Sequence, residues 1–201
     1  QYSVISAVRP AYVLSGTDET ARGINIFGAS VPMQIADVRT LAHGFGEDEE
    51  SEKAPLGHLL RSVFIKTPLH SYAGIAFLDT PGYSKPDSAA YSARTDAEIA
   101  RSQLNASDHI LWFVPADASI ISNDDLDFLN DLDKNIPKLI IITKADKVPS
   151  ADDLSRMTDG VRAALDQKGI RYEDVLTYSR RAGADCDRDA VASYLTRLDT
   201  G

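Results

Sequence analysis

Two short and almost wholly apolar runs constrain the fold of this chain more than any other feature of its sequence. They are HILWFV at residues 109–114 and KLIIIT at residues 138–143. Runs of this kind are typical of β-strands that helices cover on both faces, as in parallel sheets. Each run is far shorter than the roughly 20 apolar residues that span a bilayer. The pair therefore predicts the buried parallel strands of an α/β protein.

Amphipathic stretches alternate with these strands, which is the pattern of an α/β domain. Apolar residues at helical spacing form four stripes: Ile35, Val38, Leu41, Ala42 and Phe45; Leu126, Leu129 and Leu132; Leu154, Met157, Val161 and Leu165; and Val191, Tyr194, Leu195 and Leu198. Ser122 or Asn123 is expected to cap the second helix. Ser150 is expected to cap the third helix, and Gly169 to end it.

Three further strands are predicted at residues 61–69, 74–79 and 174–178. The first two are joined by a link that is too short for a parallel crossover, so we expect them to form an antiparallel pair. Residues 2–15 have the composition of a strand, whereas residues 16–29 have the composition of a loop.

The composition narrows the partners of the protein. The chain has 201 residues, enough for one domain, with 21 basic and 30 acidic residues and a formal net charge of −9. Such a charge repels nucleic-acid phosphates, so no nucleic-acid partner is expected. The single cysteine, Cys186, cannot form an internal disulfide, and it fits a reducing cytosol. We therefore expect a cytoplasmic protein.

The predicted strand at residues 74–79 runs into the motif DTPG, which begins at Asp79. A carboxylate at the carboxyl end of a buried strand lies where open α/β sheets bind ligands. Asp79 could hold Mg²⁺ through a water, because magnesium keeps several of its waters. Gly82 allows close approach of the backbone, and its N–H could meet a terminal phosphate. A plain turn is the alternative, since Asp, Pro and Gly are common turn residues.

The strand at residues 138–143 runs into a second polar motif, TKAD, which ends at Asp146. A fixed carboxylate accepts two hydrogen bonds from the N1–H and the exocyclic amine of guanine, a donor pair that adenine lacks. The aliphatic stem of Lys144 can lie over the plane of the base. The alternative is an exposed loop with scattered charges. Because both motifs follow buried strands, we expect them to open on one edge of the sheet.

These motifs resemble those of the GTPase domain of the dynamin superfamily. DTPG resembles the third guanine-nucleotide motif of that family, and TKAD resembles the fourth. VFIKTPLHSYAGIAFLDTPG at residues 63–82 and VPADASIISNDD at residues 114–125 are similar to the flanking segments. The similarity extends from about residue 34 to residue 181, and bacterial dynamin-like proteins are the nearest group.

The resemblance implies a P-loop GTPase-type G domain, an α/β fold. Its mostly parallel sheet would have helices on both faces and one antiparallel strand pair. The whole chain would be a partial G domain: residues 1–33 on the switch I side, residues 34–181 with both motifs, and residues 182–201 as a C-terminal helix.

The resemblance also implies roles for individual residues. Asp79 would bind Mg²⁺ through water, and Gly82 would sense the γ-phosphate. The nucleotide-binding residues would be Asp79, Thr80, Gly82, Thr143, Lys144, Asp146, Ser179 and Arg180. Water would attack the γ-phosphate of GTP, with metal and backbone neutralising charge. Family members pair through their nucleotide faces, so a homodimer is expected. Regions outside this chain could bind a membrane surface.

One family motif is missing. The phosphate-binding P-loop, G-x-x-x-x-G-K-[ST], does not occur in these residues. The nearest string, GINIFGAS at residues 23–30, has Ala29 in the place of the lysine, and we interpret it as a coincidence. We expect the P-loop and its strand, which lies beside the DTPG strand in this fold, upstream of Gln1. Without them this stretch is expected to be inactive. Thr17 and Thr20 are the candidates for the switch threonine, and Gly82 and Thr20 are the predicted catalytic residues.

Three functions remain open at this point. The first is a GTPase domain in a longer protein that couples GTP hydrolysis to dimerisation and membrane remodelling. The second is a pseudo-GTPase, an interaction module without turnover. The third is an ATPase of related fold, because the EH-domain ATPases keep an Asn-Lys-x-Asp motif and bind adenine nucleotide.

Overall fold

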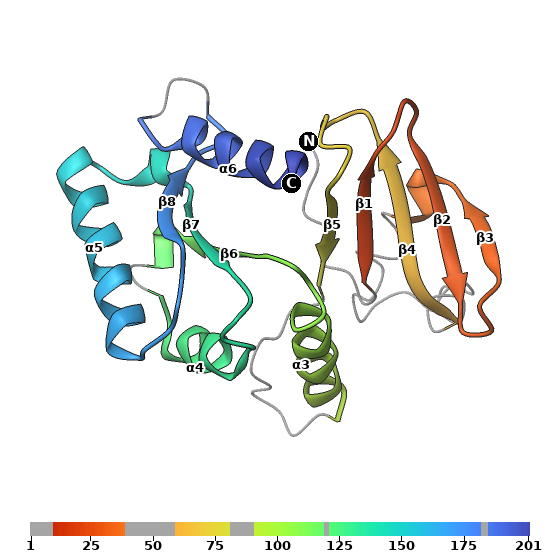
Figure 1. Cartoon of the computed structure of the whole chain (residues 1–201), viewed down its shortest axis with the longest axis horizontal. Coiled ribbons are helices and arrows are strands. Elements are labelled where there is room, and N and C mark those ends of the chain that lie inside the picture. The colour runs from red at the N-terminus through yellow and green to blue at the C-terminus, as the bar shows by residue number, and fades with distance from the viewer. Residues whose placement is uncertain (1–9, 39–58, 81–90, 119–120, 182–184) are drawn as a thin grey trace, which may run out of the picture. The chain divides into compact units, whose positions relative to one another are not determined.

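The computed structural model describes residues 10–38, 59–80, 91–118, 121–181 and 185–201 (Figure 1). The chain divides into two compact units. The first comprises residues 1–100 and 196–201, and the second comprises residues 101–195. Among the described residues, no helix combines the length and the apolar composition that a bilayer crossing requires.

The first unit contains a five-stranded mixed sheet in the order β3-β2-β4-β1-β5 (Figure 1). Its strands are β1 (Ala11–Ser15), β2 (Thr20–Asn25), β3 (Ser30–Met33), β4 (Leu60–Thr67) and β5 (Ala76–Asp79). In this sheet β1 and β4 are parallel neighbours and the other three pairs are antiparallel, where a single antiparallel pair was expected.

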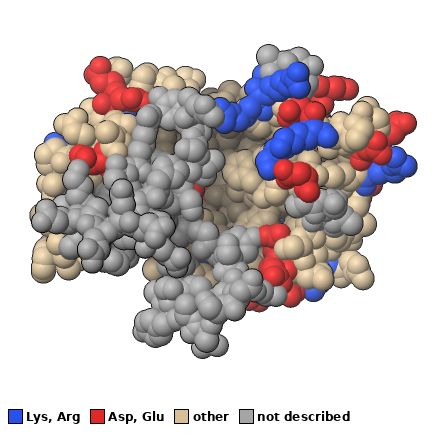
Figure 2. All heavy atoms as spheres, turned by 180° about the vertical axis from the view of Figure 1, so that it is seen from behind, with Lys and Arg blue, Asp and Glu red and all other residues tan. Residues whose placement is uncertain are grey.

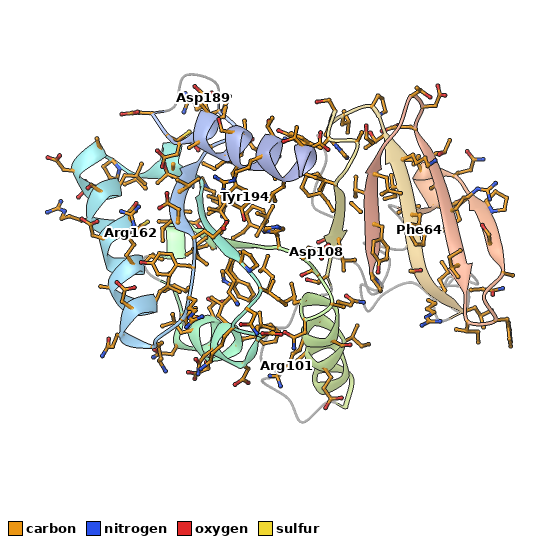
Figure 3. All side chains as sticks on the ribbon, in the orientation of Figure 1. Phe64, Arg101, Asp108, Arg162, Asp189 and Tyr194 are labelled. Atoms are coloured by element: carbon orange, nitrogen blue, oxygen red, sulfur yellow. The ribbon has the colours of Figure 1, made fainter. Side chains whose placement is uncertain are left out.

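The predicted direct pairing of residues 61–69 with residues 74–79 is wrong. The two strands, β4 and β5, run antiparallel, but β1 lies between them and hydrogen bonds to both. The aromatic rings of Tyr12 in β1 and Phe64 in β4, the latter labelled in Figure 3, stack with centroids 4.8 Å apart. The pairing thus depends on an apolar strand that is distant in sequence from β4. Within the described residues, β5 has no second strand neighbour, and the P-loop strand expected there stays a prediction.

The loop predicted for residues 16–29 is also wrong, because β2 occupies part of it. Ala21 and Gly23 of β2 are buried and alternate with the exposed Thr20 and Arg22. This is the period-2 pattern of a strand, but the inward residues are too small to register as hydrophobic. The side chain of Asn25 accepts backbone hydrogen bonds from two residues of the following turn, which leads into β3.

A small apolar core covers one part of this sheet. It is made by Ala21, Val38 and Val63, with Met33, Ile35, Leu60 and Ile65 packed against it. The predicted helical stripe that begins at Ile35 is confirmed for residues 35–38, which are helical. Its remaining members, Leu41, Ala42 and Phe45, lie outside the described residues.

The second unit contains a three-stranded parallel sheet in the order β6-β7-β8 (Figure 1). Its strands are β6 (Ile110–Pro115), β7 (Lys138–Thr143) and β8 (Asp174–Tyr178), and the latter two match their predicted bounds. Its 3-10 helices are η1 (Ala116–Ala118) and η2 (Ala145–Lys147). Among the described residues beyond β5, the α-helices are α3 (Tyr91–Leu104), α4 (Asn123–Asp131), α5 (Ala151–Gln167) and α6 (Arg188–Thr200).

The expectation that both apolar runs are covered on two faces holds for β7 only. Five of the six β7 residues are buried, and Ile140 and Ile142 are fully so. In β6, by contrast, Phe113 is 58% exposed while Trp112 and Val114 are buried. One face of β6 is thus exposed at Phe113, whereas β7, the central strand of this sheet, is buried on both faces.

Helix α5 is tied to the edge strand β8 by one arginine. Arg162, labelled in Figure 3, donates hydrogen bonds to the side chain of Asp174 at 3.0 Å and to the carbonyl oxygen of Val175 at 3.2 Å. The apolar side chains of Val161 and Leu165 are fully buried. The predicted stripe of α5 is thus a core face.

Acidic and basic side chains lie next to one another on the described part of the face in Figure 2. In the second unit, exposed ion pairs include Arg101 with Asp131 at 3.0 Å and Lys168 with Asp127 at 2.7 Å. Exposed pairs of this kind contribute about 0–1 kcal/mol each to stability.

Helix α4 begins with a complete capping box at Ser122, which decides between the two predicted caps. The hydroxyl oxygen of Ser122 accepts from the backbone N–H of Asp125 at 3.0 Å, and the Asp125 carboxylate accepts from the backbone N–H of Ser122 at 3.2 Å. We expect Ser122→Ala to lower the free energy of unfolding by about 1 kcal/mol, because one helical N–H loses its acceptor. Urea denaturation measures this loss. The control Ser155→Ala, at an exposed interior position of α5, should cost nothing. Equal effects of the two substitutions would contradict the capping role.

Candidate functional site

The motif TKAD forms a sharp turn at the carboxyl end of the central strand β7. The Thr143 hydroxyl donates to the carbonyl oxygen of Val114 in β6, at 3.5 Å. Lys144 then adopts a left-handed backbone conformation, with φ 59° and ψ 32°. Residues other than glycine rarely take this conformation, so the turn is held by its surroundings. It presents the exposed side chains of Lys144 and Asp146 at the end of the strand.

The carboxylate of Asp146 is held in place by a residue that follows β8. The hydroxyl of Ser179, which is 1% exposed, donates to Asp146 Oδ1 at 2.5 Å. The same hydroxyl oxygen accepts from the backbone N–H of Arg181 at 3.0 Å. The hydrogen bond from Ser179 holds the pKa of Asp146 below its usual range, although partial desolvation opposes it. Asp146 is therefore an ionised, oriented and solvent-accessible acceptor. Arg180, which follows Ser179 in sequence, is exposed.

Arg188 stabilises the loop that contains Ser179 by hydrogen bonds to its backbone, a role that the sequence did not indicate. Its guanidinium donates to the carbonyl oxygens of Ser179 at 2.5 Å and of Arg181 at 2.9 Å, and it lies 5.8 Å from the centre of the Tyr178 ring. The only signal in the sequence is its place at the start of the last predicted helix.

Asp117 is the second residue that sequence reasoning missed. It lies in η1, directly after β6, and its Oδ2 accepts from Lys144 Nζ at 2.6 Å. The Lys147 ammonium lies 3.7 Å from the same oxygen. The hydrogen bond from Lys144 holds the pKa of Asp117 below its usual range. The signal available beforehand was its position after a buried strand that neighbours β7.

Asp79 ends β5 in the first unit, where its Cα pairs with Ala11. Burial raises the pKa of its carboxyl from 3.8 to about 6. A nearby cation would favour the ionised form, and a single carboxylate fits a magnesium ion that keeps most of its waters. Thr80 follows as a partly buried residue outside any strand, and Gly82 lies outside the described residues. Within the described ranges, no three His, Cys, Asp or Glu side chains gather as a metal site.

The switch-threonine candidates lie in or beside β2. Thr20 is the exposed first residue of that strand, paired with Lys66 of β4. The hydroxyl of Thr17 donates to the carboxylate of Asp18 at 3.0 Å. The catalytic role of Thr20 stays a prediction.

The structure thus brings together the predicted residues of the second unit. Lys144 and Asp146 share one turn, and Ser179 joins them from the end of β8. Asp79 and Thr80 belong to the other unit and to a different sheet. That the two motifs open on one sheet edge stays a prediction.

The raised pKa of Asp79 predicts a pH-dependent stability. Between about pH 4 and 6 the folded chain keeps a proton that the unfolded chain releases, so the free energy of unfolding falls as pH rises through this window. Asp79→Asn removes the titration. The stability of this variant relative to the parent should rise by about 1–2 kcal/mol across the window, since water still reaches part of the carboxyl. Urea denaturation with a chelator present measures this. A difference that stays constant with pH would refute it.

Comparison with known proteins indicates the kind of domain. No protein-family model matches the chain. It is 29% identical over 136 residues to the GTPase Era of Aquifex aeolicus, covering 64% of this chain and 42% of that protein. It is 32% identical over 138 residues to the probable GTP-binding protein EngB of Rhodopseudomonas palustris, covering 64% of this chain and 59% of that protein. The chain therefore spans about half the length of these relatives.

Among solved structures, an oligomerised bacterial dynamin pair, described as sensing and tethering membranes over a long range, has the same fold. It matches with a TM-score of 0.63 and 13% identity, over 96% of this chain and 30% of that chain. The chain thus has the α/β fold of a P-loop GTPase G domain, as predicted. These relatives are a GTPase and a probable GTP-binding protein, and neither is named as a dynamin, so the similarity does not single out the dynamin superfamily.

Proposed function

We propose that this chain is the guanine-nucleotide-binding part of a dynamin-like GTPase. One observation carries the proposal: an ionised carboxylate, Asp146, is fixed by Ser179 at the carboxyl end of the central parallel strand and remains open to solvent. The carboxyl ends of such strands are where open α/β sheets bind ligands. Similarity to Era and EngB supports the guanine nucleotide as the ligand.

Guanine is the base that complements this carboxylate. The N1–H and the exocyclic amine of guanine would each donate to Asp146, and hydrogen bonds to a charged group stabilise by about 1.5–3 kcal/mol. Adenine offers no such donor pair, which argues against the ATPase alternative. The aliphatic stem of Lys144 would cover the plane of the guanine ring. Thr143, the last residue of β7, would lie next to the nucleotide. Ser179 and Arg180 would flank the base or the ribose.

Hydrolysis would require the residues of DTPG as well. Asp79 would hold Mg²⁺ through a water, and the bound ion would neutralise phosphate charge. The backbone N–H of Gly82 would contact the γ-phosphate. Thr80, which lies between Asp79 and Gly82 in sequence, would also contact the nucleotide. Thr20 would complete the site as the switch threonine. The attacking group would be water.

A pseudo-GTPase is the second candidate, because the P-loop motif does not occur among these 201 residues. The backbone cradle and the lysine of that motif contact the β- and γ-phosphates. Without them Asp146 could still bind the base, but turnover would be lost. We propose turnover only for a protein that supplies a P-loop.

The fold that the chain shares with the bacterial dynamin pair supports a proposal about dimerisation and membrane action. We propose that the full-length protein is cytoplasmic, pairs through its nucleotide face when GTP is bound, and acts at a membrane surface through other regions. Light scattering with a GTP analogue tests the pairing, and the same measurement with vesicles containing anionic lipid tests the binding to a membrane.

Titration of the full-length protein with fluorescent GDP and ADP, followed by measurement of phosphate release from GTP, tests the proposed function. We expect GDP to bind at least 100-fold more tightly than ADP, with release that depends on Mg²⁺. Binding without release would favour the pseudo-GTPase, and equal binding of the two nucleotides would overturn the base assignment.

A further inference from the structure

Asp117 lies where it can act on the base site through Lys144. Strands β6 and β7 are parallel, and their last residues, Pro115 and Thr143, are register partners. The chain leaves both strands at the same level, so η1 and the TKAD turn are neighbours. The 2.6 Å ion pair between Asp117 and Lys144 joins these two segments.

The two functional side chains of the TKAD turn are held from opposite sides. Lys144 reaches to Asp117 after β6, whereas Asp146 accepts from Ser179 after β8. Because β7 lies between β6 and β8, the lysine and the carboxylate diverge across the end of the central strand. The stem of Lys144 therefore runs from the end of β7 toward the end of β6.

We infer that Asp117 is a positioning residue of the base site, which holds the Lys144 ammonium so that the lysine stem forms a fixed surface for the plane of the purine ring. The inference rests on the proposed function. Asp117 itself does not contact the base.

The physical basis is preorganisation. Both partners of the pair are nearly half exposed, with side-chain exposures of 46% for Lys144 and 44% for Asp117, so the pair adds little to folding stability. A free lysine side chain samples many rotamers, and ordering it on binding weakens affinity. With Asp117 in place this ordering precedes binding. Lys147, which lies near the same carboxylate, adds a second positive charge that keeps it ionised.

The test measures the affinities of GDP and IDP for the full-length protein and for Asp117→Ala. IDP lacks the exocyclic amine but has the same ring plane. We expect the dissociation constants of both nucleotides to rise by about 3- to 10-fold, with their ratio unchanged. The melting temperature without nucleotide should stay the same. Asp117→Glu should restore most of the affinity, because it keeps the carboxylate.

A matched control is available in the same unit. Asp127 pairs with Lys168 at 2.7 Å, with side-chain exposures of 68% and 40%, away from the TKAD turn in sequence. Asp127→Ala should leave both affinities unchanged. Unchanged affinity in Asp117→Ala, a loss equal to that of the control, or a loss confined to GDP would each overturn the inference. If the parent protein binds neither nucleotide, the proposed function itself is wrong.

Discussion

Asp146→Asn is expected to convert a guanine-binding site into one that prefers xanthine. The Ser179 hydroxyl donates to one oxygen of the Asp146 carboxylate, and it would hold the amide oxygen of the asparagine in that place. The amide nitrogen then replaces the second oxygen and becomes a donor. It would face the exocyclic amine of guanine, which is also a donor, but would match the 2-oxo group of xanthine.

The expected size of this effect is about 100-fold or more in each direction, because an amide donor that faces the amine of guanine replaces a charged hydrogen bond and leaves both donors unpaired. Titration of the full-length protein with fluorescent GDP and XDP measures it. Asp127→Asn, at an exposed ion pair elsewhere in the second unit, is the control and should keep the preference of the parent. A variant that retains its preference for GDP would show that Asp146 does not contact the edge of the base.

Of the substitutions proposed for this protein, Ile140→Ala is expected to lower the free energy of unfolding most. Ile140 is fully buried in the central strand β7, between Trp112 of β6 and Val175 of β8 in the strand register. Removing its side-chain atoms loses burial and leaves a cavity, at a cost of about 2–5 kcal/mol. Urea denaturation measures the loss.

Two graded controls accompany this substitution. Ile140→Val should cost about 0.5–1.5 kcal/mol, because it removes one methyl group. Ile26→Ala, at a position that is 53% exposed, should stay within about 0.5 kcal/mol of the parent. A loss below about 1 kcal/mol for Ile140→Ala would contradict the close packing of β7.

The parallel strands were predictable because their signal is local. The run KLIIIT consists almost wholly of apolar, largely β-branched residues, and β7 has the predicted bounds. Strand β2 was missed because its inward residues are Ala21 and Gly23, whose small side chains carry no hydrophobic pattern. Composition thus identified strands that bury large side chains and overlooked one that packs closely with small ones.

The candidate site divides in the same way. Lys144 and Asp146 were predicted from the TKAD motif that follows a buried strand, and Ser179 was predicted from the family resemblance. Asp117 and Arg188 were not, because their roles arise from contacts across the end of the sheet. An aspartate in a loop and an arginine at a helix start have the same local appearance in almost any protein.

The amino-acid sequence was sufficient for the α/β class, for strands β7 and β8, and for the two motifs that end strands, because hydrophobic period and turn chemistry act over a few residues. The amino-acid sequence did not predict the order of the strands in the sheets. The placing of β1 between β4 and β5, the hydrogen bond from Ser179 to Asp146 and the ion pair from Asp117 to Lys144 join residues distant along the chain. Such contacts depend on which surfaces pack together, and that choice is made by the whole folded unit.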